Sequence, residues 1–197
     1  MSLRLPYYDQ PEGLDPAGRR IYDQIHHSRG HVVGVFALLL NSPPLAEYTA
    51  DLGGYLRFDT QLPPPVKELV ILTTLREHLC QFEWAAHETF AQTAGIPRAL
   101  IDQIKARAPI TPGHLTGFND AALIHSIREL IDAKRISNTN YNALTADFTT
   151  REITDIIALA GYYAMVSCIL NAAELAAPAN LPHLPEPDHP TNLTLTE

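Results

Sequence analysis

The sequence predicts an all-helical (all-α) protein, and three observations support this prediction. Apolar residues recur at the three- and four-residue spacing of an α-helix along most of the chain. Residues that start and stop helices flank these segments. No stretch alternates apolar and polar residues with the period of two that is typical of a half-buried strand.

The helices can be predicted in order along the chain. The first begins at Asp15-Pro16, because Asp suits the N-cap and Pro the first helical position, and it should end near Gly30. Three prolines after Leu62 separate the early helices from those that follow. We expect further helices at about 31–40, 44–58, 65–77, 80–94, 97–106, 118–134 and 138–148.

The last predicted helix is the longest. Thr149 and Glu152 have the spacing of a capping box, in which each side chain bonds an otherwise unpaired backbone N–H. From Ile153 to Leu175 the segment is apolar on most faces, which predicts burial on all sides. Since one core does not need so much apolar surface, we expect a partner subunit and therefore a homo-oligomer.

The chain should divide into three parts. Residues 1–14 form an N-terminal arm, 15–177 the helical domain, and 178–197 a proline-rich C-terminal tail. The tail could wrap a neighbouring subunit or be disordered. The 197 residues, 46% of them hydrophobic, suit one domain that folds without disulfides or metals.

Charge and composition exclude several classes of function. A net charge of −8 opposes nucleic-acid binding, which needs a basic face. The longest apolar stretch, Ile153 to Leu170, is interrupted by Asp155, so we expect no membrane span. There is no signal-peptide pattern, and two cysteines make no disulfide framework. These features predict a cytoplasmic protein.

Three residues with chemical potential share one helix face. Cys80, Glu83 and His87 have i, i+3, i+7 spacing. Cys80 would lie in the first helical turn, where the helix dipole stabilises a thiolate. Glu83 is one turn from His87, so its carboxylate could orient the imidazole or exchange a proton with it.

A fourth residue extends this candidate site. Glu68 lies on the preceding predicted helix and would reach the same cleft if the two helices form a hairpin. Two carboxylates beside a histidine suit general acid–base catalysis, because mutual repulsion and burial raise one carboxyl pKa.

This spacing resembles the carboxymuconolactone decarboxylase family, which includes the alkyl hydroperoxidase D (AhpD)-like proteins. The family pattern is Glu, eleven residues, Cys-x-x-Cys, three residues and His. Glu68, Cys80 and His87 match its Glu, first Cys and His, while Glu83 stands in place of the second Cys. Two flanks, 28–43 and 150–163 with Asn171 behind, also resemble the family, so the likeness covers about 29–178.

The resemblance implies an AhpD-like helical domain in which a helical hairpin carries the site. Without a second cysteine the dithiol peroxidase cycle cannot run within the motif, which favours the decarboxylase members. In that interpretation His87 and Glu68 or Glu83 move a proton on a small carboxylated or lactone substrate. A cation such as Arg76 or Arg29 holds a carboxylate, and no metal or cofactor takes part.

Two other functions stay open. Cys80 alone could reduce peroxides through a sulfenic acid and an external thiol, or the chain could be a non-catalytic binding or assembly protein on the same fold. Glu83 and His87 also have metal-compatible spacing, but no standard zinc pattern is complete. The histidines at 26, 27 and 31 are expected to form a solvated helix end, with a metal-binding or pH-sensing role as the alternative.

Overall fold

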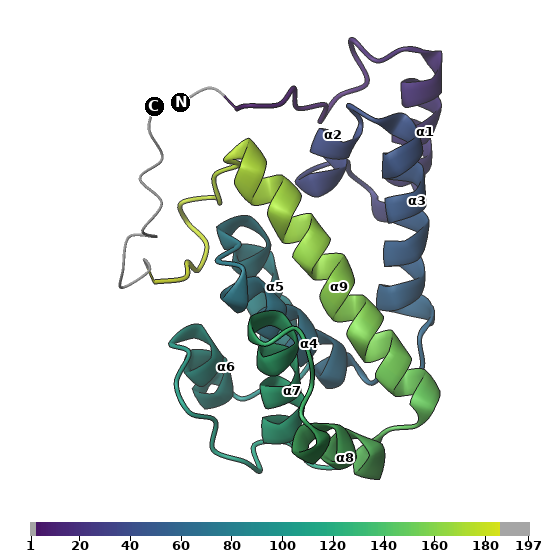
Figure 1. The fold of residues 1–197 in the computed structure, drawn as a ribbon. Coiled ribbons are helices and arrows are strands. Elements are labelled where there is room, and N and C mark those ends of the chain that lie inside the picture. The colour runs from purple at the N-terminus through teal and green to yellow at the C-terminus, as the bar shows by residue number, and fades with distance from the viewer. Residues whose placement is uncertain (1–2, 186–197) are drawn as a thin grey trace.

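The computed structural model describes residues 3–185. Over these residues the chain is helical without strands, which confirms the predicted fold class (Figure 1). The elements are α1 (Pro16–Arg29), α2 (Val35–Leu39), α3 (Pro43–Gly54), the π-helix η1 (Tyr55–Asp59), α4 (Pro64–Glu77), α5 (Gln81–Thr93), α6 (Arg98–Lys105), α7 (Asp120–Asp132), α8 (Asn138–Asp147) and α9 (Thr150–Ala173).

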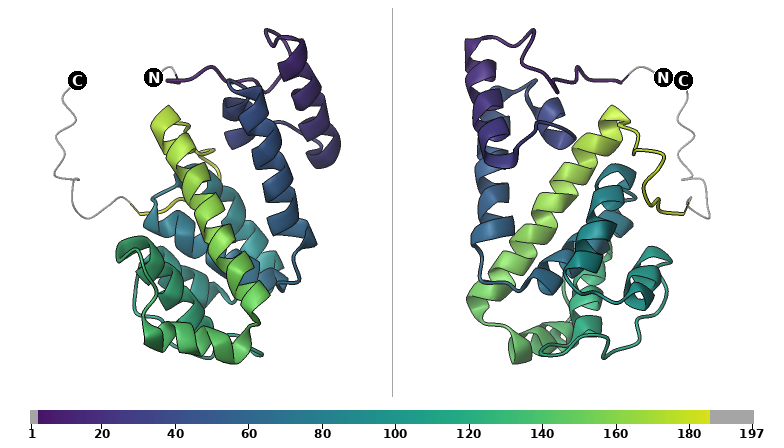
Figure 2. Two further views of the ribbon diagram at one scale, coloured as in Figure 1. Left: turned by 45° about the vertical axis from the view of Figure 1, so that its right-hand side comes forward. Right: turned by 180° about the vertical axis from the view of Figure 1, so that it is seen from behind.

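Helix α4 forms the centre of the protein. It packs against α5, α7 and α9, and all its residues from Val66 to Leu75 except Lys67 are buried. Helix α9 passes diagonally between the α1–α3 region and the α4–α7 region in the views of Figures 1 and 2. The core that positions the candidate site is therefore built around α4.

The predicted helix ends agree well with the structure at both ends of the domain. The Asp15 side chain accepts a hydrogen bond from the Gly18 N–H at 2.7 Å, and Gly30 in the left-handed conformation ends α1. At α9, Thr149 and Glu152 form the predicted capping box. These local signals are read correctly from sequence because each depends on residues only three positions apart.

Within this chain the core covers only part of α9, and the sequence predicts that a partner subunit buries the rest. Ile156, Leu159 and Tyr163 are buried, whereas Ile157 on the same helix is 38% exposed. Within this chain α4, not α9, is buried on nearly every side. By length and composition alone α9 could cross a membrane, but 56% of its most apolar stretch is buried inside the domain, as in the core helix of a soluble protein.

The helix predicted at 31–40 is shorter than expected. Gly34 has φ 62° and ψ −131°, a conformation that L-residues with a side chain rarely adopt, so α2 begins only at Val35. A Cβ atom on Gly34 would lie 2.7 Å from Cε1 of Phe82 on α5. This glycine therefore permits both the turn and the close approach of α2 to α5.

We expect Gly34→Ala to lower the free energy of unfolding by about 1–3 kcal/mol, through backbone strain and displacement of Phe82. Urea unfolding measures this change. Gly54→Ala is the matched control, since Gly54 is helical and a Cβ there meets nothing within 4 Å. Equal stability of the two variants would contradict the assigned strain.

The predicted helix at 44–58 contains a change of geometry. From Tyr55 the chain forms one π-helical turn, in which the N–H of Thr60 donates to the Tyr55 carbonyl at 3.1 Å. Single π-turns are rare and often occur at functional sites. Here the turn carries Arg57 and Phe58, and the Phe58 ring is 64% exposed.

Both terminal segments contact the domain where the structure describes them. The Tyr7 hydroxyl accepts a hydrogen bond from the Gly34 N–H, and the Tyr8 N–H donates to the Ala37 carbonyl. Leu184 is buried, and its backbone exchanges two hydrogen bonds with the Gln81 side chain at 2.8 and 3.0 Å. The start of the predicted tail thus packs on its own chain, and residues 186–197 lie outside the described residues.

Candidate active site

The hairpin of α4 and α5 creates the centre of the candidate site. Leu79 adopts the left-handed conformation at φ 53°, and the Cys80 N–H donates to the Leu75 carbonyl at 2.9 Å. This tight turn folds α5 back along α4. As a result, Oε2 of Glu68 lies 2.8 Å from Nδ1 of His87.

The other ring nitrogen of His87 meets two further groups. Its Nε2 lies 3.1 Å from the hydroxyl oxygen of Tyr163 on α9 and 3.5 Å from Oε2 of Glu83. The imidazole is 1% exposed. Two carboxylates and a phenol therefore surround one buried histidine.

Electrostatics favour a protonated imidazole at this position. Burial alone would lower the pKa of His87, but the hydrogen bonds and negative charges of Glu68 and Glu83 outweigh it and raise that pKa. Burial raises the pKa of Tyr163 well above its ordinary value, so the phenol stays neutral. In the neutral histidine Nδ1–H donates to Glu68 and Nε2 accepts from Tyr163. In the protonated form Nε2–H points to the Tyr163 and Glu83 oxygens.

A cavity of about 360 Å³ opens beside these groups. We call it the His87 cavity; Glu83, His87, Tyr163, Arg29 and Arg57 are among the residues that line it. Glu68 does not line it and lines another cavity instead. Glu83 is thus the carboxylate that shares a cavity with His87, whereas Glu68 contacts the imidazole from outside this cavity.

The cations differ from the sequence expectation. Arg29 does line the His87 cavity: its guanidinium donates to the Ala50 carbonyl at 3.0 Å and stacks 4.4 Å from the Phe36 ring centre. Its buried Nε makes no hydrogen bond to any described residue. Burial, assisted by the positive charge of Arg57, lowers the pKa of Arg29. A half-buried guanidinium that forms no ion pair with a carboxylate of the described residues suits an anionic ligand.

Arg76 lies elsewhere, so its expected role in holding a carboxylate of the substrate in this cavity is not supported. Its Nε donates to the Lys105 carbonyl at 2.6 Å, and the residue does not line the His87 cavity. It lies in the last turn of α4, about two turns from Glu68. Arg57, which the sequence analysis missed, takes its place beside Arg29 through the π-turn.

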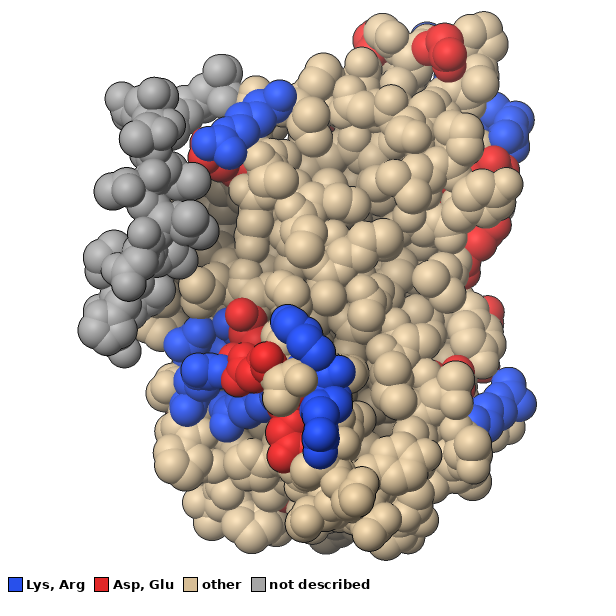
Figure 3. Space-filling view, in the orientation of Figure 1, with Lys and Arg blue, Asp and Glu red and all other residues tan. Residues whose placement is uncertain are grey.

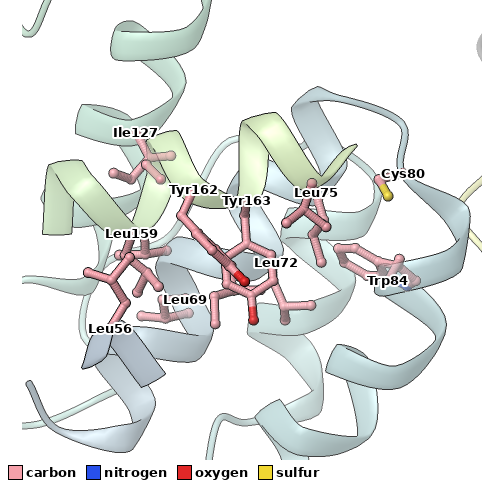
Figure 4. Packing of buried hydrophobic residues seen from close by; sticks show 14 of the residues in the cluster. Leu56, Leu69, Leu72, Leu75, Cys80, Trp84, Ile127, Leu159, Tyr162 and Tyr163 are labelled. Atoms are coloured by element: carbon pink, nitrogen blue, oxygen red, sulfur yellow. The ribbon is translucent and has the colours of Figure 1, made fainter. Parts of the chain in front are cut away.

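Cys80 also differs from expectation. It is the N-cap of α5 rather than a first-turn residue, and it is fully buried in the apolar cluster with Leu75 and Trp84 (Figure 4). Burial raises the pKa of its thiol to about 11, although hydrogen bonds with the backbone of Glu83 and Phe82 and with the Ser167 side chain lower it. A thiol, not the expected thiolate, is therefore present near neutral pH, and Cys80 does not line the His87 cavity.

The other candidate residues of the described chain do not form a second catalytic or metal site. Among residues 3–185 no group of three or more His, Cys, Asp or Glu side chains is arranged to hold a metal ion. The histidines at 26, 27 and 31 are exposed, and only His31 borders the His87 cavity. Cys168 is exposed on α9, whereas Cys80 is buried.

Comparison with known proteins agrees with this architecture. Residues 43–111, which carry Glu68, Cys80, Glu83 and His87, match the model of the carboxymuconolactone decarboxylase family. This match confirms the resemblance recognised in the motif. A search of curated proteins gave no significant match.

Two solved structures share the fold. One is an AhpD-core, uncharacterized peroxidase-related protein from Ralstonia eutropha JMP134, with a TM-score of 0.68, 17% identity, and coverage of 88% of this chain and 92% of that chain. The other is an uncharacterized peroxidase-related protein from Silicibacter sp. TM1040, with a TM-score of 0.68, 14% identity, and coverage of 91% and 95%. The chain therefore has an AhpD-like fold.

Proposed function

We propose that this protein is a carboxymuconolactone decarboxylase-like enzyme that moves a proton on a small carboxylated or lactone substrate in the His87 cavity. The observation that carries the proposal is the division of the motif residues: Glu83 and His87 line the cavity, while the Cys80 thiol is buried outside it with a raised pKa. This arrangement supports acid–base chemistry over thiol chemistry.

Each side chain has a role that its position suggests. In a γ-lactone carboxylic acid the bond between carbon and the carboxylate breaks, CO₂ leaves, and the electron pair moves into the conjugated lactone. The imidazolium of His87 then gives its Nε2 proton to carbon, while Glu68 and Tyr163 hold the ring. Arg29 and Arg57 offer positive charge to a carboxylate or a lactone oxyanion.

Assay of carboxylated γ-lactones with a CO₂ detector tests this function. We expect turnover that is unchanged in Cys80→Ser, because the buried thiol takes no part. Peroxide reduction with an external thiol is measured in parallel. Peroxide turnover that disappears in Cys80→Ser, with no CO₂ release from any lactone, would replace the proposal by the one-cysteine peroxidase. No turnover of either kind would favour the non-catalytic alternative.

We also propose that the protein is a cytoplasmic homo-oligomer. Cys80 and Cys168 are both free, as expected in a reducing compartment. Helix α3 and η1 expose a row of large apolar side chains, which are Leu45, Tyr48, Leu52, Tyr55 and Phe58. Such a row is the kind of surface that subunits bury against each other.

A further inference from the structure

A second, larger cavity lies on the other side of Glu68. Its volume is about 660 Å³, and we call it the Lys67 cavity; Arg57, Pro64, Lys67, Glu68, Ile71 and Phe90 are among its lining residues. Arg57, Phe58 and Phe90 also line the His87 cavity, so they form the wall between the two. His87 itself borders only the first cavity, which makes the Lys67 cavity a separate space.

Two cations, Lys67 and Arg57, border the Lys67 cavity, and neither forms an ion pair with a carboxylate of the described residues. The Lys67 ammonium donates to the Arg57 carbonyl at 2.6 Å, and burial together with the charge of Arg57 lowers the pKa of Lys67. The Arg57 guanidinium lies between two rings, 5.4 Å from the centre of Phe58 and 5.6 Å from that of Phe90. Glu68 is the only carboxylate among the lining residues, and one of its oxygens already binds His87. The charge of Asp59, which is outside the lining, also acts on Lys67.

Apart from Thr93, the rest of the wall is apolar. Pro64, Pro65, Ile71, Phe90 and Ala94 contribute hydrocarbon surface. A cavity of several hundred cubic ångströms with apolar walls and a few polar groups is typical of sites for small organic molecules. Excess positive charge beside an apolar wall selects a ligand that combines a ring or short chain with a negative group.

We propose that the Lys67 cavity is a second binding site, which takes a small amphipathic carboxylate such as an aromatic monocarboxylate. The ligand's carboxylate binds Lys67 and Arg57, and its ring packs on Ile71 and Phe90. Because Glu68 borders this site and holds Nδ1 of His87, the bound anion increases the proton affinity of the Glu68–His87 pair. The site does not depend on which reaction occurs in the His87 cavity.

Calorimetric titration of the full chain with benzoate, and with neutral benzamide as a probe of the apolar contribution, tests the proposal. We expect benzoate to bind more tightly than benzamide, and Lys67→Met to weaken benzoate binding about tenfold by removing a charged hydrogen-bond donor. Lys134→Met is the matched control, because the Lys134 ammonium also donates to a backbone carbonyl at 2.6 Å but lies exposed, away from the cavity. Equal binding by the wild type and Lys67→Met would overturn the site.

Two further variants separate the site from its neighbours. Ala94→Phe fills the Lys67 cavity without removing a polar group, so it should abolish benzoate binding while circular dichroism shows an intact fold. Arg29→Met alters the His87 cavity but no residue that lines the Lys67 cavity, so it should leave benzoate affinity unchanged. Loss of binding in Arg29→Met but not in Ala94→Phe would place benzoate in the His87 cavity and contradict the proposal. Binding that falls as protein concentration rises would assign this surface to a second copy instead.

Discussion

Replacing His87 by Asn is expected to lower kcat for CO₂ release by about 10²–10⁴-fold, the usual contribution of a general acid. The Asn amide can still donate to Glu68 near the position of Nδ1, but it carries no transferable proton toward the cavity. Circular dichroism and a steady-state lactone assay measure the fold and the rate. A variant that folds normally and keeps wild-type kcat would remove His87 from the mechanism.

The pH dependence adds a sharper control. The acid form of His87 is present below its pKa, which Glu68 and Glu83 raise, so the rate should fall as pH rises through that raised value. Glu68→Gln removes one of the two charges and should move this fall to lower pH.

The pH dependence of stability has the same sign. The ion pair stabilises the fold fully below about pH 6.5, the ordinary histidine pKa. This contribution is lost as pH rises through the folded-state pKa of His87.

The largest expected effect on stability is that of Glu88→Ala. Glu88 is fully buried on α5 and binds three donors: the Trp84 indole N–H at 2.7 Å, Arg98 at 2.8 Å and Lys105 at 2.9 Å. Truncation leaves a buried indole N–H and a half-buried ammonium without a partner. We expect a loss of about 3–5 kcal/mol in the free energy of unfolding, measured by urea denaturation.

Glu47→Ala is the control for this prediction. Glu47 pairs with exposed Arg20 at 3.1 Å, and such surface pairs contribute about 0–1 kcal/mol. Glu88→Ala combined with Lys105→Met should recover part of the loss, since the double variant leaves one fewer unpaired charge. If Glu88→Ala lowered the free energy of unfolding no more than Glu47→Ala, the prediction would be wrong. Such a result would show that water reaches the Glu88 site.

The sequence predicted the helices well because capping and apolar spacing are local properties. It also predicted that a hairpin of two adjacent helices could bring Glu68 to His87, and the two side chains are in contact. The expected common cleft is different in the structure, because Glu83 and His87 line one cavity and Glu68 lines the neighbouring one. The sequence did not predict that α2 begins only after Gly34 or that a π-turn at Tyr55 ends α3. Both features depend on packing against segments that are distant in the sequence. Neither Phe82 nor Tyr162, against which Gly34 and Gly53 pack, is adjacent to them in sequence.

The errors at the candidate site have the same origin. The sequence spacing placed Cys80 on the face of Glu83 and His87 but could not show that the apolar core covers its thiol. Arg57 was missed because only the π-turn brings it to the cavity. Tyr163 stood in a flank that resembles the family, but a contact 76 residues away from His87 leaves no local pattern.

The hairpin also has a consequence for the order in which the protein assembles. The Glu68–His87 contact closes a loop of only 19 residues, whereas the Tyr163–His87 contact closes one of 76. The entropy lost on closing a chain increases with loop length, and contacts between residues close in sequence form faster. The hairpin therefore can bring its carboxylate and imidazole together before α9 docks. In that order of events, the arrival of α9 supplies the phenol and encloses a pair that is already formed.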